Sequence, residues 1–403
     1  MILEFCVSNY LSIKEELKLS FVSTPLKESC SEPNDLFPLE DTGISLVRGA
    51  VIYGANASGK SNVLKGFDFY KRFITDSFRN SQVGESIGIE NFRLNASSVK
   101  EPTAFEATFT DGKFIYRYGF EADNHTVHEE WLYKRACKKR AKDVELFYRE
   151  ADGTTVHPKS RLMQELVNKK MIRSNALLLS TAAQFNEPTA VGILGWLNDT
   201  LVVFCSEDDK LWNNAIKRLD DEALRNRIIS FAKYADLGIE NISKIDNRIV
   251  SDHRQYDDEG REVNSVTFAF NQNESEGTIK YFSLAYPIID ALDNGKRIVI
   301  DELDSKLHPL LVKKIVTLFN DAKTNPKGAQ LLFTAHDTFL LSAGLFRRDQ
   351  VWFTQKDNFG ATELFSLAEY KVRSTSPFER DYLLGKYGAT PIFGDIEKIF
   401  NPA

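Results

Sequence analysis

The chain has 403 residues, enough for two or three structural units of about 150 residues each, which excludes a disulfide-stapled miniprotein. Hydrophobic residues make up 42% and charged residues 27%, as in a soluble globular protein, and no apolar run approaches the ~20 residues that span a bilayer. The formal net charge of −6 excludes a polycation that coats nucleic acid over its whole surface.

The N-terminal residues and the cysteines predict a cytoplasmic protein. Residues 1–5 include an acid and no basic stretch, which is typical of a strand start rather than of a secretory signal. The four cysteines, Cys6, Cys30, Cys137 and Cys205, lie far apart and form no CxxC pair, so we expect reduced thiols that mostly pack.

Two basic clusters are candidate contacts for nucleic acid. Lysine runs are normally exposed, so each cluster favours a solvated surface over a phosphate contact, and the second interpretation stays open as an alternative. The clusters are Lys134, Arg135, Lys138, Lys139, Arg140 and Lys142, and Lys169, Lys170 and Arg173.

Strand patterns open the chain and lead into a helix. Short strands are predicted within residues 3–13, 17–22 and 44–53, with a polar loop near residues 24–43. A helix over residues 61–78 follows, because its apolar residues recur close to a 3.6-residue period. The apolar face consists of Val63, Phe67, Tyr70 and Ile74.

The predicted secondary structure changes twice in the middle of the chain. Residues 101–149 alternate apolar and polar side chains between turn signals, which predicts an antiparallel β subdomain. Helical patterns dominate residues 158–237 without a sustained heptad, so a long coiled coil is not expected and a short helical arm or lid stays open. Two strand patterns, 239–250 and 263–270, then flank the polar turn 257–262 and predict a hairpin.

The C-terminal part alternates helices and strands, which predicts an α/β fold with a largely parallel sheet. Helices are expected from about residues 277 and 308 and over 338–343, and strands over 297–302, 330–335 and 350–354. We therefore divide the chain into an N-terminal lobe of residues 1–157, a helical insertion of residues 158–240 and a C-terminal lobe of residues 241–403.

A phosphate-binding motif lies between the third strand and the first helix. The pattern G-x-x-x-x-G-K-[ST] allows a tight turn whose backbone N–H groups surround phosphate oxygens at the positive end of a helix. Lys60 is expected to reach the β- and γ-phosphates, and Ser61 to offer its hydroxyl to Mg²⁺. The expected nucleotide contacts are Gly54, Ala55, Asn56, Ala57, Ser58, Gly59, Lys60, Ser61 and Asn62.

Polar residues end two later apolar strands. Asp301 and Glu302 follow an apolar run, and successive strand side chains point to opposite sides, so Asp301 can face Mg²⁺ while Glu302 orients an attacking water. Unpartnered carboxylates are costly to bury, which favours a catalytic pair over a structural one. His336 ends the next strand, at the edge where open α/β sheets bind ligands, and there its imidazole can contact the γ-phosphate.

Ser275 and Gly277 stand at the predicted start of a helix. A serine at a helix N-cap needs no functional explanation by itself. The order of elements makes the pair a candidate. The chain contains, in this order, a phosphate loop, a long insertion, S-x-G at a helix start, an acidic strand and a histidine strand.

This order resembles the ABC-type ATPases of the SMC, RecF and OLD group, whose heads close as dimers over two ATP molecules. Residues 5–15 and 53–67 resemble a narrower family, the small OLD-like AAA ATPases of bacterial anti-phage and abortive-infection loci, which include RloA-like and PARIS AriA-like proteins. The stretches DELDSKLHP and TAHDTFLL and the tail 347–391 are similar to the same family. The resemblance covers residues 1–120 and 265–395, and the middle matches only loosely.

The resemblance implies an ABC-type P-loop head of two lobes, with a mainly parallel sheet, an antiparallel β subdomain and a helical insertion. It assigns ATP and Mg²⁺ as cofactors, with Lys60 and Ser61 as their ligands. By the same resemblance, Asp301 is the Walker B aspartate, Glu302 the catalytic glutamate and His336 the switch histidine.

The resemblance also assigns residues that act between subunits. Ser275 and Gly277 take the place of the signature motif, which contacts the γ-phosphate of the opposite subunit, and Asp304 or Ser305 occupies the D-loop. The chain departs from SMC proteins and transporters in two places, since Ala57 replaces a frequent glycine and the signature lacks the LSGG form.

The glutamine of the Q-loop has no clear place in the sequence. Gln184 is the candidate, although an amide exposed after a helix explains it equally well. The phosphate loop itself does not read the base, so the preference for ATP comes from the family.

The predicted function is an ATP-hydrolysing dimeric switch of an anti-phage system. Only 67 residues follow His336, and the second lobe uses them, so we expect no nuclease in this chain and a separate effector, of the TOPRIM-like, RloB-like or HNH nuclease kind. The alternative is a RecF-like DNA-binding repair ATPase that uses the basic clusters. A transporter motor subunit is disfavoured by the N-terminal strands and the large middle insertion.

Overall fold

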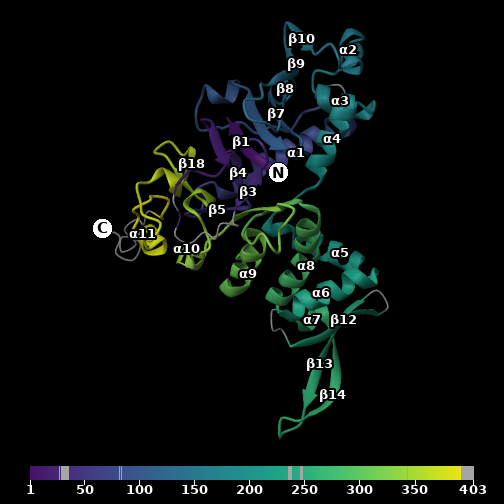
Figure 1. Cartoon of the computed structure of the whole chain (residues 1–403), viewed down its shortest axis with the longest axis vertical. Coiled ribbons are helices and arrows are strands. Elements are labelled where there is room, and N and C mark those ends of the chain that lie inside the picture. Colours follow the sequence, from purple (N-terminus) through teal and green to yellow (C-terminus); the bar gives the residue numbers. More distant parts are fainter. Residues whose placement is uncertain are drawn as a thin grey trace, which may run out of the picture.

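The computed structural model describes residues 1–26, 28, 36–80, 82, 84–234, 238–245, 248–342 and 344–391. The molecule is elongated, with an antiparallel sheet at one end, a mostly parallel sheet in the centre and a projecting β arm at the other end (Figure 1). Every described helix is too short or too polar to cross a bilayer.

The central sheet has six strands in the order β11-β15-β16-β5-β17-β18. All neighbouring pairs are parallel except the last, in which β18 runs antiparallel to β17. The predicted α/β class with a largely parallel sheet is confirmed. The strands are β5 (Gly49–Gly54), β11 (Thr200–Val203), β15 (Arg297–Ile300), β16 (Gln330–Thr334), β17 (Val351–Lys356) and β18 (Thr362–Ser366).

The second large sheet is antiparallel and confirms the β subdomain predicted over residues 101–149. Its order is β10-β9-β8-β7-β6-β1-β2, so the N-terminal strands complete one of its edges. The strands are β1 (Ile2–Ser8), β2 (Leu17–Ser20), β6 (Thr103–Thr110), β7 (Phe114–Ala122), β8 (Val127–Ala136), β9 (Val144–Glu150) and β10 (Gly153–Val156).

Helix α1 (Lys60–Asn80) joins the phosphate loop to the antiparallel sheet. The apolar face predicted from its 3.6-residue period is buried, because Val63, Phe67, Tyr70 and Ile74 are each at most 1% exposed. The ring of Phe67 meets that of Phe5 edge-on, with centroids 5.2 Å apart. This packing fixes the direction of α1 and therefore the position of the loop at its N-terminus.

The predicted helical insertion divides between the two ends of the molecule. Helices α2 (Arg161–Asn168), α3 (Leu178–Gln184) and α4 (Pro188–Asn198) form one group, in which α3 and α4 pack against α1. Strand β11 follows and joins the central sheet, within a segment in which the sequence predicted mainly helices. Helices α5 (Asp208–Arg218) and α6 (Glu222–Tyr234) pack against α8. The boundaries at residues 157 and 240 stay predictions.

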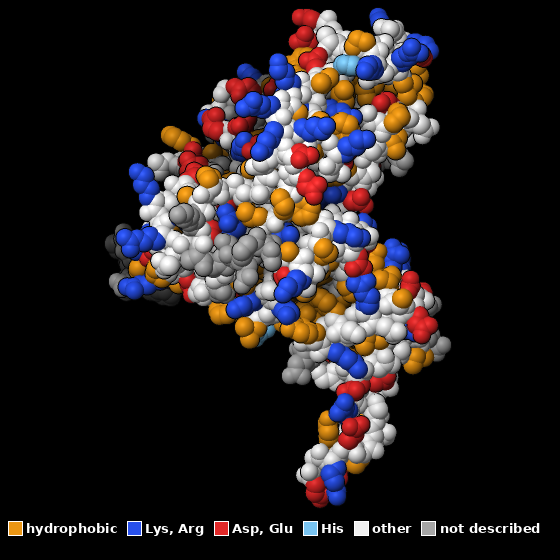
Figure 2. Space-filling model, viewed as in Figure 1, with side chains coloured by type: hydrophobic (Ala, Val, Ile, Leu, Met, Phe, Trp, Pro, Cys, Tyr) orange, Lys and Arg blue, Asp and Glu red, His pale blue; other side chains and the backbone are white. Residues whose placement is uncertain are grey.

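A three-stranded arm replaces the simple hairpin that the sequence predicted. Strands β12 (Ile239–Ile245), β13 (Arg248–Tyr256) and β14 (Glu262–Ala269) pair antiparallel in that order, and β13 and β14 turn at the predicted polar residues. The arm projects from the body with both charge signs on its surface (Figure 2). It leads through α7 (Phe270–Asn273) into α8 (Glu276–Asn294).

The C-terminal helices α9 (Pro309–Asn320), α10 (Phe339–Ser342) and α11 (Phe378–Leu383) follow in chain order. Their apolar residues share one core with β5, β15, β16 and β17, including Phe319, Leu340, Phe353 and Tyr382. The helices and strands predicted from the alternating pattern of residues 277–354 are therefore present.

The polar segment near residues 24–43 is more ordered than the sequence predicted. It contains β3 (Leu36–Leu39), which pairs antiparallel with β4 (Ile44–Val47) in a separate two-stranded sheet. The single strand predicted over residues 44–53 is interrupted at Arg48, so β4 and β5 belong to different sheets. Part of the predicted loop lies outside the described residues.

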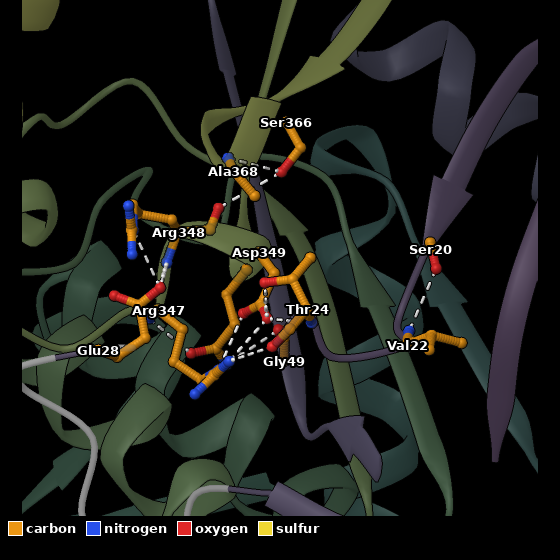
Figure 3. Close-up of polar contacts among 11 residues, drawn as sticks. Ser20, Val22, Thr24, Glu28, Gly49, Arg347, Arg348, Asp349, Ser366 and Ala368 are labelled. Carbon is orange, nitrogen blue, oxygen red and sulfur yellow. Dashed lines mark hydrogen bonds and ion pairs between the residues drawn. The ribbon is translucent and has the colours of Figure 1, made fainter. Parts of the chain in front are cut away.

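Buried ion pairs tie the segment after β2 to the short helix before β17 (Figure 3). The backbone N–H of Thr24 donates to Asp349 Oδ2 at 2.8 Å, and Arg347 holds the same carboxylate through Nε and a terminal nitrogen at 2.9 and 2.8 Å. Arg348 Nε donates to Glu28 Oε1 at 3.0 Å, and both side chains are buried. Charges at such depth are stable only when paired, so the contact fixes residues that are more than 300 positions apart.

Two of the predicted free thiols are described. Cys6 and Cys137 are free and partly buried, and burial raises the pKa of the Cys6 thiol to about 12. Cys30 lies outside the described residues.

Candidate functional site

Strands β5, β16 and β15 lie side by side and parallel, so their carboxyl ends meet at one edge of the central sheet. The loop after β5, the acids after β15 and the histidine after β16 surround a cleft of about 630 Å³. Its lining residues are Asn56, Ala57, Ser58, Gly59, Lys60, Ser61, Asn62, Glu302 and His336. Nine of the predicted site residues therefore share one cleft.

The second glycine of the phosphate loop, Gly59, is required because the backbone passes close to Thr362. Gly59 has φ +109°, and a Cβ at this position would lie 2.1 Å from Thr362 Oγ1. Thr362 Oγ1 donates to Ser58 O at 3.0 Å, and the hydroxyls of Ser58 and Thr354 lie 2.6 Å apart. Thr354 of β17 and Thr362 of β18 therefore hold the loop through Ser58, and only glycine fits at position 59 next to Thr362.

Lys60 lies within the curve of the loop. Its Nζ donates to Gly54 O at 2.8 Å and to Ala55 O at 3.1 Å. Burial lowers the pKa of Lys60, while the carboxylates of Glu302 and Asp301 act in the opposite direction. An ammonium group held among backbone dipoles at a helix N-terminus provides the positive charge that a triphosphate needs.

A hydroxyl, a carboxylate and a threonine meet beside the loop. Ser61 Oγ donates to Asp301 Oδ1 at 3.1 Å, and Thr334 Oγ1 donates to the same oxygen at 2.7 Å. Thr334 Oγ1 also accepts the N–H of Glu302 at 2.7 Å. Hydroxyl and carboxylate oxygens are the hard ligands that Mg²⁺ prefers, so the donor set of Ser61 and Asp301 fits this ion.

Glu302 and His336 lie next to each other in the lining of the cleft. His336 Nε2 lies 3.5 Å from Glu302 Oε1, and both side chains are partly exposed. Glu302 has φ +51°, an uncommon conformation for a residue with a side chain. β15 ends at Ile300, so both acids, Asp301 and Glu302, lie in a turn and not at the alternating strand positions that the sequence predicted. Asp301 is hydrogen-bonded to Ser61 and Thr334, and Glu302 lies next to His336.

Asp304 contacts the loop after β16 of its own chain. Its Oδ2 accepts the backbone N–H groups of His336 and Asp337, each at 2.7 Å. Asp304 is not among the lining residues of the cleft. Within one chain it orients the loop that carries His336, and a contact to nucleotide stays a prediction.

Ser275 and Gly277 lie outside this cleft. Ser275 caps α8, since its Oγ accepts the N–H of Thr278 at 3.1 Å. Gly277 lies against the loop after β15, where a Cβ would be 2.6 Å from Lys306 O. Glu274, which precedes Ser275, accepts from Ser251 Oγ at 2.5 Å, and His253 Nε2 lies 2.7 Å from the same carboxylate oxygen.

Gln184 and several residues of the basic clusters lie away from the cleft or contact other parts of the chain. Gln184 ends α3, a helix packed on α1 and α4, and does not line the cleft. Lys134 Nζ lies 3.8 Å from the ring centroid of Phe114, and Arg173 donates to the carbonyls of Ser77 and Phe78. The structure therefore gives internal partners to members of both clusters.

Four residues around the phosphate loop were not predicted from the sequence, namely Ser12, Thr334, Thr354 and Thr362. Asn62 Nδ2 donates to Ser12 Oγ at 2.6 Å, and Ser12 Oγ lies 2.7 Å from Thr362 Oγ1. Ser12 belongs to the stretch that carried the resemblance, and Thr334 directly precedes Ala335 and His336, so both had a local signal. Thr354 and Thr362 had none, because only the pairing of β17 with β5 and β18 brings them to the loop.

The parallel sheet, the loop between β5 and α1 and the acid after β15 together define a P-loop nucleotide-binding protein. Residues 50–342 match the family model described as "AAA domain, putative AbiEii toxin, Type IV TA system". The chain belongs to this family, which confirms the predicted AAA-type ATPase membership.

Two solved structures are similar to the chain over most of its length. The SMC head domain from Thermotoga maritima has 13% sequence identity and a TM-score of 0.41, over 91% of this chain and 98% of that one. The recombination mediator protein RecF, in the structure titled RecF-ATPrS in the RecFOR pathway, has 12% identity and a TM-score of 0.31 over the same shares. No curated protein matches the chain.

Proposed function

We propose that the protein is a Mg²⁺-dependent ATPase whose hydrolysis cycle switches a head-to-head dimer between closed and open states. The observation that carries this proposal is the shared cleft, in which Lys60 and Ser61 of the phosphate loop lie beside Glu302 and His336. A lysine, a hydroxyl and a carboxylate in this order around a P-loop are the parts that phosphoryl transfer to water requires.

Ser61 and Asp301 would hold Mg²⁺, and Lys60 the β- and γ-phosphates. When bound, the ion neutralises charge that develops on the phosphate oxygens. Glu302 directs its carboxylate into the cleft, where it orients the attacking water and takes its proton. Thr334 fixes the Asp301 carboxylate and the Glu302 backbone with one hydroxyl, so the metal ligand and the base keep a constant separation.

The dimer follows from the place of Ser275 and Gly277. They stand at the N-terminus of a 19-residue helix but outside the chain's own cleft. Helix N-termini attract phosphate, so a second copy that brings this end of α8 to the cleft completes the site. Each nucleotide then lies between Lys60 of one copy and Ser275 of the other.

The biological role that we propose is an anti-phage switch in the bacterial cytoplasm. The family description, which names a putative AbiEii toxin and a type IV TA system, supports a place among abortive-infection proteins. In this proposal the ATPase dimer holds a separate effector of the TOPRIM-like, RloB-like or HNH nuclease kind and releases or activates it on infection.

The ATPase proposal is tested with Glu302→Gln, which keeps the shape of the side chain and removes its basicity. We expect turnover to fall by about 10²- to 10³-fold and the solution mass to double with Mg-ATP, because the closed dimer no longer hydrolyses its nucleotide. Glu363→Gln, at an exposed position of β18, is the control and keeps wild-type values. Normal turnover in Glu302→Gln would exclude the assigned base.

Direct DNA binding is the second candidate, and an exposed basic turn favours it. Lys138, Lys139, Arg140 and Lys142 are exposed between β8 and β9. If this turn binds phosphate groups, affinity for duplex DNA falls steeply with salt and is lost when the four residues are changed to glutamine. Salt-insensitive or absent binding leaves the effector proposal as the better account.

A further inference from the structure

The first turns of α8 contact the loop that carries Glu302. Gly277 approaches this loop so closely that a Cβ would lie 2.6 Å from Lys306 O. Three residues later, Lys280 Nζ donates to Glu302 O at 3.0 Å. Residues three apart share one face of a helix, so α8 meets residues 302–306 along a single face.

The backbone of Glu302 is held on both sides in its uncommon conformation. Its N–H donates to Thr334 Oγ1 at 2.7 Å, and its carbonyl accepts from Lys280 Nζ and, at 3.1 Å, from the N–H of Ser305. A positive φ at a residue with a side chain persists only where the surroundings enforce it. Side chains from β16 and α8 supply two of these restraints.

Lys280 is itself in an unusual place for a lysine. It is 4% exposed and lies between buried neighbours on α8 such as Tyr281 and Leu284. An ammonium group at this depth is costly unless hydrogen bonds replace its water. The Glu302 carbonyl accepts one of these hydrogen bonds, so the buried ammonium group restrains the backbone of the proposed catalytic acid.

We propose that Lys280 is a positioning residue that sets the direction of the Glu302 carboxylate through the Glu302 carbonyl. The inference rests on the proposed ATPase function and deepens it. Lys280 follows Gly277 by three residues and Ser275 by five, and these two residues would contact the nucleotide of the second copy. It therefore links the signature end of each chain to that chain's own catalytic glutamate, and through it one nucleotide site of the dimer to the other.

The test compares two lysines of similar chemistry. Lys280→Met removes the donor to Glu302 O, whereas Lys71→Met removes a partly buried lysine of α1 that donates to Thr200 O at 2.5 Å, away from the cleft. We expect kcat of Lys280→Met to fall by about 10- to 100-fold with unchanged affinity for a fluorescent ATP analogue. Lys71→Met keeps both values, and Lys280→Arg, which retains a donor, recovers most of kcat.

Hydrogen exchange without nucleotide gives a readout that does not depend on turnover. The amides of Glu302, Leu303 and Ser305 are hydrogen-bonded within the loop or to β16. In Lys280→Met they should exchange about tenfold faster, and in Lys71→Met at the wild-type rate. If Lys280→Met does not fold, Lys280→Gln, which is shorter than lysine, allows the same comparison.

The outcomes separate this inference from the ATPase proposal. Wild-type loop exchange and wild-type kcat in Lys280→Met overturn the positioning role, even if the protein is an active ATPase. A wild-type protein without ATPase activity overturns the proposed function instead, while the exchange rates still report whether Lys280 holds the loop. Faster exchange with normal kcat shows that Lys280 orders the backbone without directing the carboxylate, and also overturns the proposal.

Discussion

The chain contains two helix N-termini with a serine and a glycine, and they differ in how much of a site surrounds them. At α1, Lys60 and Ser61 lie in a cleft whose other wall carries Glu302 and His336. At α8, Ser275 caps its own helix, and Glu274 and Glu276 flank it in the sequence. At the first terminus a lysine lies within the loop and shares a cleft with Glu302 and His336, whereas at the second the nearby Lys306 Nζ lies 3.7 Å from a carboxylate oxygen of Glu276.

This difference teaches that a helix N-terminus alone is a weak anion site. Its partial positive charge is common to both helices. What distinguishes α1 is the lysine among loop carbonyls, together with the acids that follow β15 and the histidine that follows β16. We therefore assign nucleotide binding to α1 and assign α8 the smaller part of closing a site on a second copy.

The largest effect expected on this comparison comes from removing the cation of the α1 site. Lys60→Ala should lower ATP affinity or turnover by at least about 10²-fold, because the described lining of the cleft contains no second lysine or arginine. Lys65→Ala, at an exposed position of the same helix, should change neither. Calorimetric titration with ATP measures the affinity, and binding of normal strength to Lys60→Ala would refute the assignment.

The α8 site is examined with two substitutions that separate capping from phosphate contact. Aspartate caps a helix as well as serine does, whereas alanine costs about 1 kcal/mol of stability. Ser275→Asp should therefore keep the free energy of unfolding but, by repelling phosphate, abolish ATP-driven dimerisation in the Glu302→Gln background. Ser275→Ala should lower the free energy of unfolding and also abolish the ATP-driven dimerisation. An intact dimer in Ser275→Asp would show that Ser275 is a cap and nothing more.

A smaller effect is expected from filling the space at Gly59. Gly59→Ala introduces a methyl group at φ +109° against Thr362 and should lower the free energy of unfolding by about 1–3 kcal/mol, with loss of nucleotide binding. Gly192→Ala, in open space on α4, should instead raise it by about 0.5–1 kcal/mol. Thermal unfolding of both variants, with and without Mg-ATP, gives the comparison.

The smallest expected effect is a pH dependence confined to the α1 site. Burial lowers the pKa of Lys60 below its usual 10.5, so ATP affinity should fall as pH rises through the lowered pKa and the ammonium is lost. The free energy of unfolding of the unliganded chain should instead rise with pH over the same range. Between the native and the unfolded pKa of Lys60, the unfolded chain binds more protons than the native one. Lys60→Arg should remove the alkaline loss of affinity. A loss that persists in Lys60→Arg must come from another group.

Local patterns in the sequence determined most of the elements and the main site residues. The P-loop motif predicted the turn and the helix start, the 3.6-residue period predicted the buried face of α1, and the apolar run before Asp301 predicted β15. These signals are reliable because backbone geometry and helix periodicity depend on neighbouring residues.

Tertiary structure alone decided how these parts meet. Thr362 holds the phosphate loop, Thr334 joins Asp301 to Glu302, and Lys280 reaches the Glu302 carbonyl from α8. It also placed β3 within the predicted loop and Ser275 outside the cleft. Such contacts join residues up to 304 positions apart, and strand order and helix packing, not local sequence, bring them together.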